Sequence, residues 1–338
     1  MKWFSELFTI DMIDNNSNNE SVFIGRTNYL RGVFAILIVL GHCSMRFETE
    51  PLILMLIHKA NFLWVCFFLY VSGWSLAYNY EHRENYLNGF LKHKVMKLLL
   101  LGLEAEIIGR FLKCIILREH FEFNIKILTG WNWYIYECLL LYILFYLAYK
   151  YISNTKMLLV VVWASSFLLA VVFWGLYNWG NWEGWTFAYY YSTLSFPLGI
   201  SQHYIVKGNK YTKKNICKIS MIALVCSVVS LICVTLPQKS FIGGVVLHNV
   251  LGCGFLILLT FILFIVDLKQ IKGIRFLTRY STNIYLYQFC IMTIVTTIYQ
   301  MYNTSIDGIY VLVVVFLIII LAIFMEHFNL LITKIIKK

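Results

Sequence analysis

Long apolar segments alternate with short polar connections along almost the whole chain. Each apolar segment is close to the roughly 20 residues that an α-helix needs to cross the hydrocarbon core of a bilayer. The sequence therefore predicts an all-α fold, a polytopic integral membrane helix bundle with about ten transmembrane helices. The predicted spans are 27–46, 61–79, 95–117, 131–150, 157–177, 185–206, 215–236, 241–266, 282–302 and 308–333.

The segments outside these spans are short. Residues 1–26 are predicted to form a polar N-terminal tail, which includes the run Asp14–Glu20 and has no recognisable cleavable signal peptide. Residues 27–333 hold the transmembrane domain, and residues 334–338 form a short basic end. An even number of spans predicts that both termini lie on the same side of the membrane.

The composition supports a lipid environment. Hydrophobic residues make up 60% of the chain and charged residues only 13%, whereas soluble globular chains average roughly 45–50% and about 25%. The mean hydropathy is +0.72. A water-soluble core could not cover this much apolar surface, which excludes a soluble domain.

Basic residues orient the predicted helices, because loops rich in Lys and Arg stay on the cytoplasmic side. With the N-terminus inside, 20 of the 28 Lys and Arg residues fall on inner segments, so both termini are predicted to be cytoplasmic. The same rule accounts for the net charge of +11, so this charge does not imply nucleic-acid binding. The expected partners are membrane lipids, and no nucleic acid is expected. The eight remaining basic residues are Arg31, Arg46, Lys59, Arg110, Lys113, Arg118, Lys126 and Lys239.

The nine cysteines lie almost entirely within predicted helices. They form no C-x-x-C pair and have no histidine at the spacing of a metal site. We therefore interpret them as small packing residues and predict no metal.

The first predicted helix carries two ionisable residues, Arg31 and His42, although such groups are costly inside a bilayer. They are eleven positions apart, so at about 100° per residue they share one helix face and lie about 16 Å apart along its axis. Arg31 alone could be an interface anchor whose guanidinium reaches the head groups, and His42 alone could be a packing histidine hydrogen-bonded to a neighbour. Together they indicate a cation at a cytoplasmic channel mouth and an acid–base group further along that channel.

An arginine followed by ten residues and a histidine resembles the first-helix signature of the membrane-bound acyltransferase-3 family, whose members acylate cell-surface carbohydrates. Other segments are similar to further motifs of this family and follow in the family's order. They are Phe67–Gly73 ("FF-x-x-SG"), Trp133-Tyr134 ("W-F/Y"), Phe196–Gly199 ("F-x-x-G") and Ser281–Leu286 ("S-x-x-IYL"). The resemblance runs from residue 25 to residue 333 and implies ten helices, as the family has.

Two positions depart from the family's motifs. Gln288 stands where members often carry a histidine, and the family's R-x-x-R pair is replaced by Lys94 and Lys97. Lysine binds phosphate as a point charge and lacks the bidentate fork of arginine. The resemblance still implies that Arg31, Lys94 and Lys97 bind an acyl-CoA donor.

His42 and Glu326 are the candidate catalytic residues. Transfer of an acyl group to a sugar hydroxyl needs a base, and an ordinary histidine has a pKa near neutrality. His42 as general base and His42 as transient acyl carrier fit the sequence equally well. Glu326 falls where the last helix of family members carries an acidic residue, and it is one of two carboxylates that could lie near His42.

Trp133 and Glu137 are the candidate contacts to a carbohydrate acceptor on the outer face. Glu137 follows Trp133 by one turn on the same helix face, near the predicted outer surface. The tryptophan belongs either to the aromatic belt of a membrane interface or to a stacking platform for sugar rings. Glu137 either meets a sugar hydroxyl or is solvated at the interface.

Two further features have structural interpretations. Glu106 and Arg110 are spaced i, i+4 in one predicted helix and would neutralise each other. His248 is interpreted as a packing residue.

Taken with the resemblance, these features predict an enzyme, an O-acetyltransferase-like acyltransferase. It would move an acyl group, most often acetyl, from cytoplasmic acyl-CoA to a hydroxyl of a cell-surface or exported polysaccharide or of its lipid-linked precursor. A transporter of polysaccharide or of a lipid intermediate, and an accessory subunit of an export complex, are the alternatives, although no broken-helix pair or repeat favours transport. Richness in Ile, Lys and Asn indicates an AT-rich bacterial genome and hence a multi-pass protein of the bacterial cell membrane. The acceptor, the acyl group and the oligomeric state stay open.

The distribution of basic residues makes a testable prediction about topology. A reporter fused after Lys338 should be cytoplasmic, and one inserted near Asn181 should face outside, because the inner segments carry most of the positive charge. Reporter activity specific to each compartment measures both positions. The same side for both reporters would show that the helix count is wrong.

Overall fold

The computed structural model describes residues 19–118, 120, 133–179, 188–207, 220–225, 227–228, 240–265 and 272–336. Within these ranges the chain is helical and contains no strand, which confirms the predicted fold class. The elements are α2 (Asn19–Ser44), α3 (Leu52–Lys59), α4 (Asn61–His82), α5 (Met96–Leu117), α7 (Trp133–Tyr151), α8 (Thr155–Trp179), α9 (Ala188–Tyr191), α10 (Ser195–Lys207), α12 (His248–Ile265), α13 (Lys272–Met301) and α14 (Gly308–Ile336). Two π-helical segments, η1 (Leu91–Val95) and η2 (Phe241–Leu247), lead directly into α5 and α12.

Several helical stretches of the described chain are long and apolar enough to cross a membrane. There are five of them: Leu52–His82, Thr155–Trp179, Phe241–Leu263, Lys272–Met301 and Gly308–Asn329. The count of ten crossings and the cytoplasmic position of both termini stay predictions. The predicted span 215–236 lies mostly outside the described residues.

The predicted span 185–206 differs from the structure, because two helices replace one. α9 ends at Tyr191, and α10 begins at Ser195, whose backbone N–H donates to the carbonyl of Ser192 at 2.9 Å. Pro197 lies in the first turn of α10, where its missing N–H removes no intrahelical hydrogen bond. The interruption leaves residues 192–194 as a turn between the two helices.

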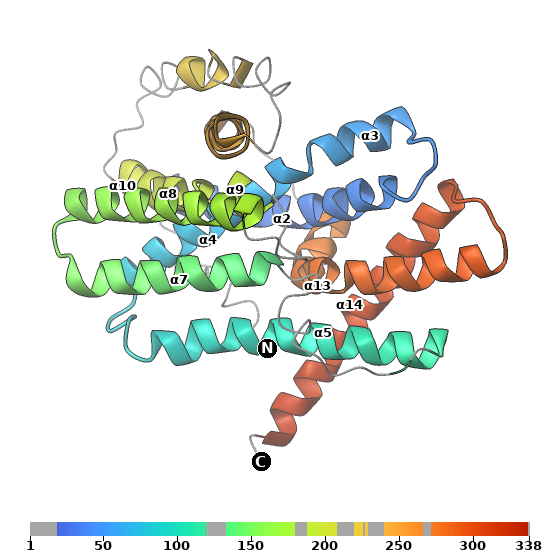
Figure 1. Cartoon of the computed structure of the whole chain (residues 1–338). Coiled ribbons are helices and arrows are strands. Elements are labelled where there is room, and N and C mark those ends of the chain that lie inside the picture. The colour runs from blue at the N-terminus through green and yellow to red at the C-terminus, as the bar shows by residue number, and fades with distance from the viewer. Residues whose placement is uncertain are drawn as a thin grey trace.

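Three pairs of helices make the most extensive contacts: α4 with α10, α2 with α13, and α13 with α14. Figure 1 also shows α5, α7 and α8 running side by side, and both neighbouring pairs in this row are in contact. α7 contributes to the central hydrophobic core together with α4, α5, α10 and α13.

The α4–α10 contact brings the two backbones together at a pair of glycines. A Cβ atom on Gly73 would lie 2.2 Å from the carbonyl oxygen of Phe196, and one on Gly199 would lie 2.1 Å from that of Tyr70. Both distances are far shorter than real side-chain contacts, so this crossing needs glycine on both helices. Membrane helices commonly approach through small residues in this way, because close packing drives their association in lipid. The segments 67–73 and 196–199 therefore pack directly against each other.

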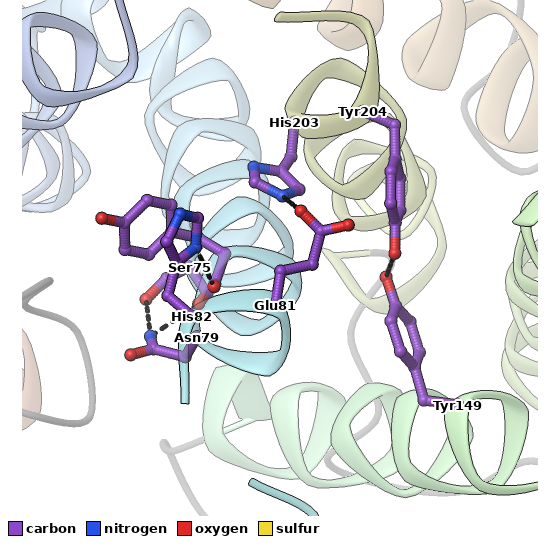
Figure 2. A network of polar contacts seen from close by, with 8 residues as sticks. Ser75, Asn79, Glu81, His82, Tyr149, His203 and Tyr204 are labelled. Atoms are coloured by element: carbon purple, nitrogen blue, oxygen red, sulfur yellow. Dashed lines mark hydrogen bonds and ion pairs between the residues drawn. The ribbon is translucent and has the colours of Figure 1, made fainter. Parts of the chain in front are cut away.

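Polar contacts extend the α4–α10 contact away from the glycines. His203 Nε2 lies 2.8 Å from Glu81 Oε2, and the hydroxyl of Tyr204 donates to that of Tyr149 on α7 at 3.2 Å. Figure 2 shows His203 directed at Glu81 and the two tyrosines meeting tip to tip. These contacts hold α4, α10 and α7 together at one end of the bundle.

α2 and α13 also approach through a glycine. A Cβ atom on Gly32 would lie 2.5 Å from the backbone nitrogen of Thr278, and the Thr278 hydroxyl donates to the carbonyl of Tyr29 at 3.2 Å. Further along, Cys43 Sγ lies 3.8 Å from Met292 Sδ. The two helices thus run in the same direction, and Gly32 and Cys43 of α2 both lie against α13.

The α4–α10 crossing makes a prediction about stability. Gly199→Ala should destabilise the folded protein by about 2 kcal/mol, the order expected for forcing a methyl group into a packed interior, since the new Cβ meets backbone that cannot rotate away. The melting temperature of the detergent-purified protein measures the effect. Gly273→Ala is the matched control, because nothing lies within 4 Å of its added Cβ. Equal melting temperatures for both variants would contradict the proposed contact.

Candidate active site around Arg31 and His42

A small cavity lies inside the bundle next to Arg31. Its volume is about 20 Å³, which is the space of about one water molecule. α2, α4, α7 and α13 each contribute to its wall. The lining residues are Arg31, Val65, Phe68, Tyr134, Ile135, Ser281, Thr282, Tyr285 and Leu286.

This cavity brings together motifs that are far apart in the sequence. Phe68 belongs to segment 67–73, Tyr134 to the Trp133-Tyr134 pair, and four lining residues to segment 281–286. The rings of Tyr134 and Tyr285 meet edge to face, with centroids 5.1 Å apart. The order of the motifs along the chain gave no reason to expect that they share one wall.

Arg31 is a buried cation beside an aromatic wall. Its relative exposure is 5%, and it lines the cavity together with Tyr134 of α7 and Tyr285 of α13. Its Nη1 donates to Asn28 Oδ1 at 3.5 Å, one turn earlier on α2. An anchor that reaches the head groups would leave its guanidinium exposed, so the burial favours the channel interpretation over the anchor interpretation.

His42 lies three turns further along α2 and is half-buried. Its ring packs against Phe289 of α13, with centroids 4.6 Å apart. Its Nδ1 is buried and has no hydrogen-bond partner within the described part of the chain. The packing interpretation required a hydrogen bond to a neighbour, and the described residues supply none. Within the described chain, the Nδ1 atom of His42 is therefore not held by a packing hydrogen bond.

Glu137 is fully buried, so it is not solvated at the interface as one sequence interpretation allowed. Its carboxylate accepts hydrogen bonds from Thr193 Oγ1 at 3.1 Å and from Ser192 Oγ at 3.4 Å. Both hydroxyls belong to the turn between α9 and α10. Trp133 begins α7 and is half-buried. Neither Trp133 nor Glu137 lines the Arg31 cavity.

Glu326 lies on α14, where its Oε1 is 3.5 Å from Arg279 Nε of α13. Arg279, the partner of Glu326, and Phe289, which contacts His42, are ten residues apart on α13. Glu326 and His42 are therefore separated by about 15 Å along the axis of α13. The structure therefore does not bring Glu326 to His42, as the sequence suggested it could. Among the described residues, the ion-pair partner of this carboxylate is Arg279.

Lys94 and Lys97 flank the junction of η1 and α5, and both are partly exposed. They do not line the Arg31 cavity. Both structural interpretations are confirmed by geometry: Arg110 Nε lies 3.2 Å from Glu106 Oε1, and His248 is buried, with its Nδ1 2.6 Å from the carbonyl of Gly243.

Gln288 is the residue that sequence reasoning underestimated, because it was noted only for the histidine it replaces. Its side chain is fully buried on α13. Neither its amide nitrogen nor its amide oxygen has a hydrogen-bond partner among the described residues. The signal was present in the sequence as a spacing, since Gln288 follows Ser281 and Tyr285 on the same helix face.

Comparison with known proteins identifies one family. The family model described as an acyltransferase domain matches residues 24–325, nearly the whole chain. No curated protein and no solved structure matches the sequence. The match includes Arg31, His42, Gln288 and every residue that lines the cavity.

Proposed function

The chain belongs to the acyltransferase-3 family and is a membrane acyltransferase, and from this premise we propose that it uses cytoplasmic acyl-CoA, most often acetyl-CoA, as its donor. The acceptor is a hydroxyl of a cell-surface or exported polysaccharide, or of its lipid-linked precursor. The observation that carries the proposal is a buried arginine beside a cavity and, on the same helix face, a histidine whose Nδ1 has no hydrogen-bond partner among the described residues.

Arg31 suits the anionic end of the donor. A guanidinium forms paired hydrogen bonds with phosphate oxygens, and removal from water strengthens its attraction for an anion. Lys94 and Lys97 add positive charge on the side that the distribution of basic residues predicts to be cytoplasmic. The donor would enter from that side, with its acyl group pointing along α2 toward His42.

His42 suits the transfer step. As general base, its free nitrogen takes the proton of the acceptor hydroxyl while the oxygen forms a bond to the acyl carbon. The carbon–sulfur bond then breaks, and the CoA thiolate receives the proton. As acyl carrier, the same nitrogen forms the first bond to the acyl carbon and releases CoA before the hydroxyl attacks. Both routes need an imidazole nitrogen that no protein group occupies.

The acceptor would approach from the outer face of the bacterial cell membrane. Trp133 supplies an aromatic surface for a sugar ring at the start of α7, and Glu137 supplies a buried acceptor for a hydroxyl one turn later. A transporter or an accessory subunit of an export complex would have no acyl transfer to perform. Transfer of labelled acetyl from acetyl-CoA in membranes that carry the protein separates the enzyme from both alternatives.

Arg31→Ala should raise the KM for acetyl-CoA about tenfold or more, because a charge-assisted contact to phosphate contributes on the order of 1.5–3 kcal/mol. The KM of Arg31→Lys should lie between those of Arg31→Ala and the wild type, because lysine keeps the positive charge but lacks the bidentate geometry of the guanidinium. Initial rates of labelled acetyl transfer over a range of acetyl-CoA concentrations measure the effect. The control is Arg118→Ala, which removes an exposed arginine at the end of α5. An unchanged KM in Arg31→Ala would return Arg31 to the anchor role.

His42→Ala should lower acyl transfer by about 10²–10⁴-fold, the usual effect of losing a general base. His42→Gln is the sharper test, because glutamine roughly keeps the volume and a hydrogen bond but cannot shuttle a proton. Both variants should accumulate in the membrane at the level of His82→Gln, which alters an exposed histidine and serves as the control. Near wild-type turnover by His42→Gln would show that His42 only packs or orients.

A further inference from the structure

Gln288 presents two unpartnered polar atoms in the interior of a membrane protein. Its side chain has 0% relative exposure, and both its amide nitrogen and its amide oxygen lack partners among the described residues. Leaving a buried amide unpaired is unfavourable by roughly 1–3 kcal/mol on the scale of protein mutations. A methionine or leucine would avoid that penalty, so the amide needs a reason to be there.

Another buried glutamine shows what a structural role looks like in this bundle. The amide oxygen of Gln202 on α10 accepts hydrogen bonds from the hydroxyls of Tyr70 and Thr260, the second at 3.1 Å. Tyr70 and Thr260 also contact each other at 3.1 Å. This network ties α10 to α4 and α12. Gln288 makes no comparable contact within the described chain.

The face of α13 that carries Gln288 runs from the Arg31 cavity to the level of His42. Ser281, Tyr285, Gln288 and Met292 fall within one stripe of the helix, at spacings of four, three and four residues. Ser281 and Tyr285 line the cavity, and Met292 meets Cys43, the neighbour of His42. Gln288 directly precedes Phe289, which contacts the His42 ring, so it lies on α13 close to the level of His42.

The matching face of α2 is apolar in the same interval. Ala35 and Ile38 fill the positions between Arg31 and His42, and both are buried. The stripe on α13 and the apolar stretch on α2 are both described in the structure. Between the level of Tyr285 and the level of His42, Gln288 is the polar residue that these two stretches contain. Any polar group that a ligand carries through this interval would meet the Gln288 amide.

We propose that Gln288 binds the amide of the acyl donor's pantetheine arm that lies nearest the thioester sulfur. This inference rests on the proposed use of acyl-CoA. A primary amide offers one acceptor and two donors, which complement the N–H and C=O of a secondary amide. That amide lies two carbon atoms from the sulfur. Because helix side chains incline toward the N-terminus, the Gln288 amide extends from the level of His42 back toward the Arg31 cavity, where the arm's amide lies when the thioester reaches His42. The acceptor comes from the other side of His42, which leaves the donor as the ligand of this interval.

The test combines a variant protein with a variant donor. Purified wild-type protein and Gln288→Met are titrated with labelled acetyl-CoA, which competes with two unlabelled analogues. One analogue has an ester in place of the amide nearest the sulfur, and the other has the ester at the more distant amide. Gln202→Met is the matched control protein, because it removes a buried glutamine whose partners are side chains of the protein.

In the wild type, the near-amide ester should bind about five- to tenfold more weakly than acetyl-CoA, the effect of one lost hydrogen bond in a buried site. Gln288→Met should bind acetyl-CoA more weakly by a similar factor and should no longer distinguish it from the near-amide ester. Gln202→Met should discriminate between the donors as the wild type does. The far-amide ester should show no dependence on residue 288.

The melting temperature separates donor binding from a structural role. Gln288→Met should melt at the wild-type temperature or higher, because it replaces an unpartnered amide by an apolar side chain of similar shape, whereas Gln202→Met should melt lower. Wild-type discrimination retained by Gln288→Met, or a lowered melting temperature with unchanged affinity, would overturn the assignment of Gln288 alone. A wild-type protein that binds no acetyl-CoA would overturn the proposed donor and this inference with it.

Discussion

Gly73 and Gly199 fix how closely α4 and α10 approach each other, and the position of the site follows from that approach. Each glycine lies against a backbone carbonyl of the other helix, so the two helices have no freedom to shift apart without losing this packing. α4 is then placed to present Val65 and Phe68 to the Arg31 cavity on its other side. The polar contacts of Tyr70 with Gln202 and of Glu81 with His203 depend on the same alignment. In lipid, where apolar surface gains little from mutual burial, such close packing and internal hydrogen bonding carry the association of helices.

The bundle treats its buried polar groups in two different ways. Glu137, Gln202 and His203 have side-chain partners on neighbouring elements, as the lack of water in a membrane interior requires. His42 Nδ1 and the Gln288 amide do not, within the described chain. Both unpartnered groups lie where α2 and α13 run together beyond the Arg31 cavity. Unpaired buried atoms also occur elsewhere in the described bundle, for example at Trp64 and Ser166. The ligand role proposed for His42 and Gln288 therefore depends on their place near the Arg31 cavity and not on the missing hydrogen bonds alone.

The sequence predicted the features that depend on local periodicity. Helix formation, the shared face of Arg31 and His42, and the pairing of Glu106 with Arg110 all follow from about 100° of rotation per residue, and the structure agrees on the fold class and on that pairing. The sequence could not predict which faces of separate helices meet. Glu326 resembled a catalytic group by its place in the chain but lies beside Arg279, and Glu137 seemed close to the surface but is buried by the α9–α10 turn. That turn was missed because Pro197 alone did not show that the apolar segment breaks before it.

The spacing of Arg31 and His42 has a consequence for the kind of donor the site can use. Their separation of about 16 Å along α2 is about half of the roughly 30 Å thickness of the hydrocarbon core. A small donor held at Arg31 could not reach His42, whereas a donor with a long, narrow arm could bind its charged end at one residue and deliver its acyl group to the other. Such an arm crosses a largely apolar interval, where its own amides would lose their hydrogen bonds to water. A single buried amide on the protein, placed late in that interval, compensates the loss nearest the thioester and also fixes how far the arm can slide. In this proposal Gln288 both compensates the buried amide of the donor's arm and sets where the acyl group stops relative to His42. Neither Arg31 nor His42 could do both.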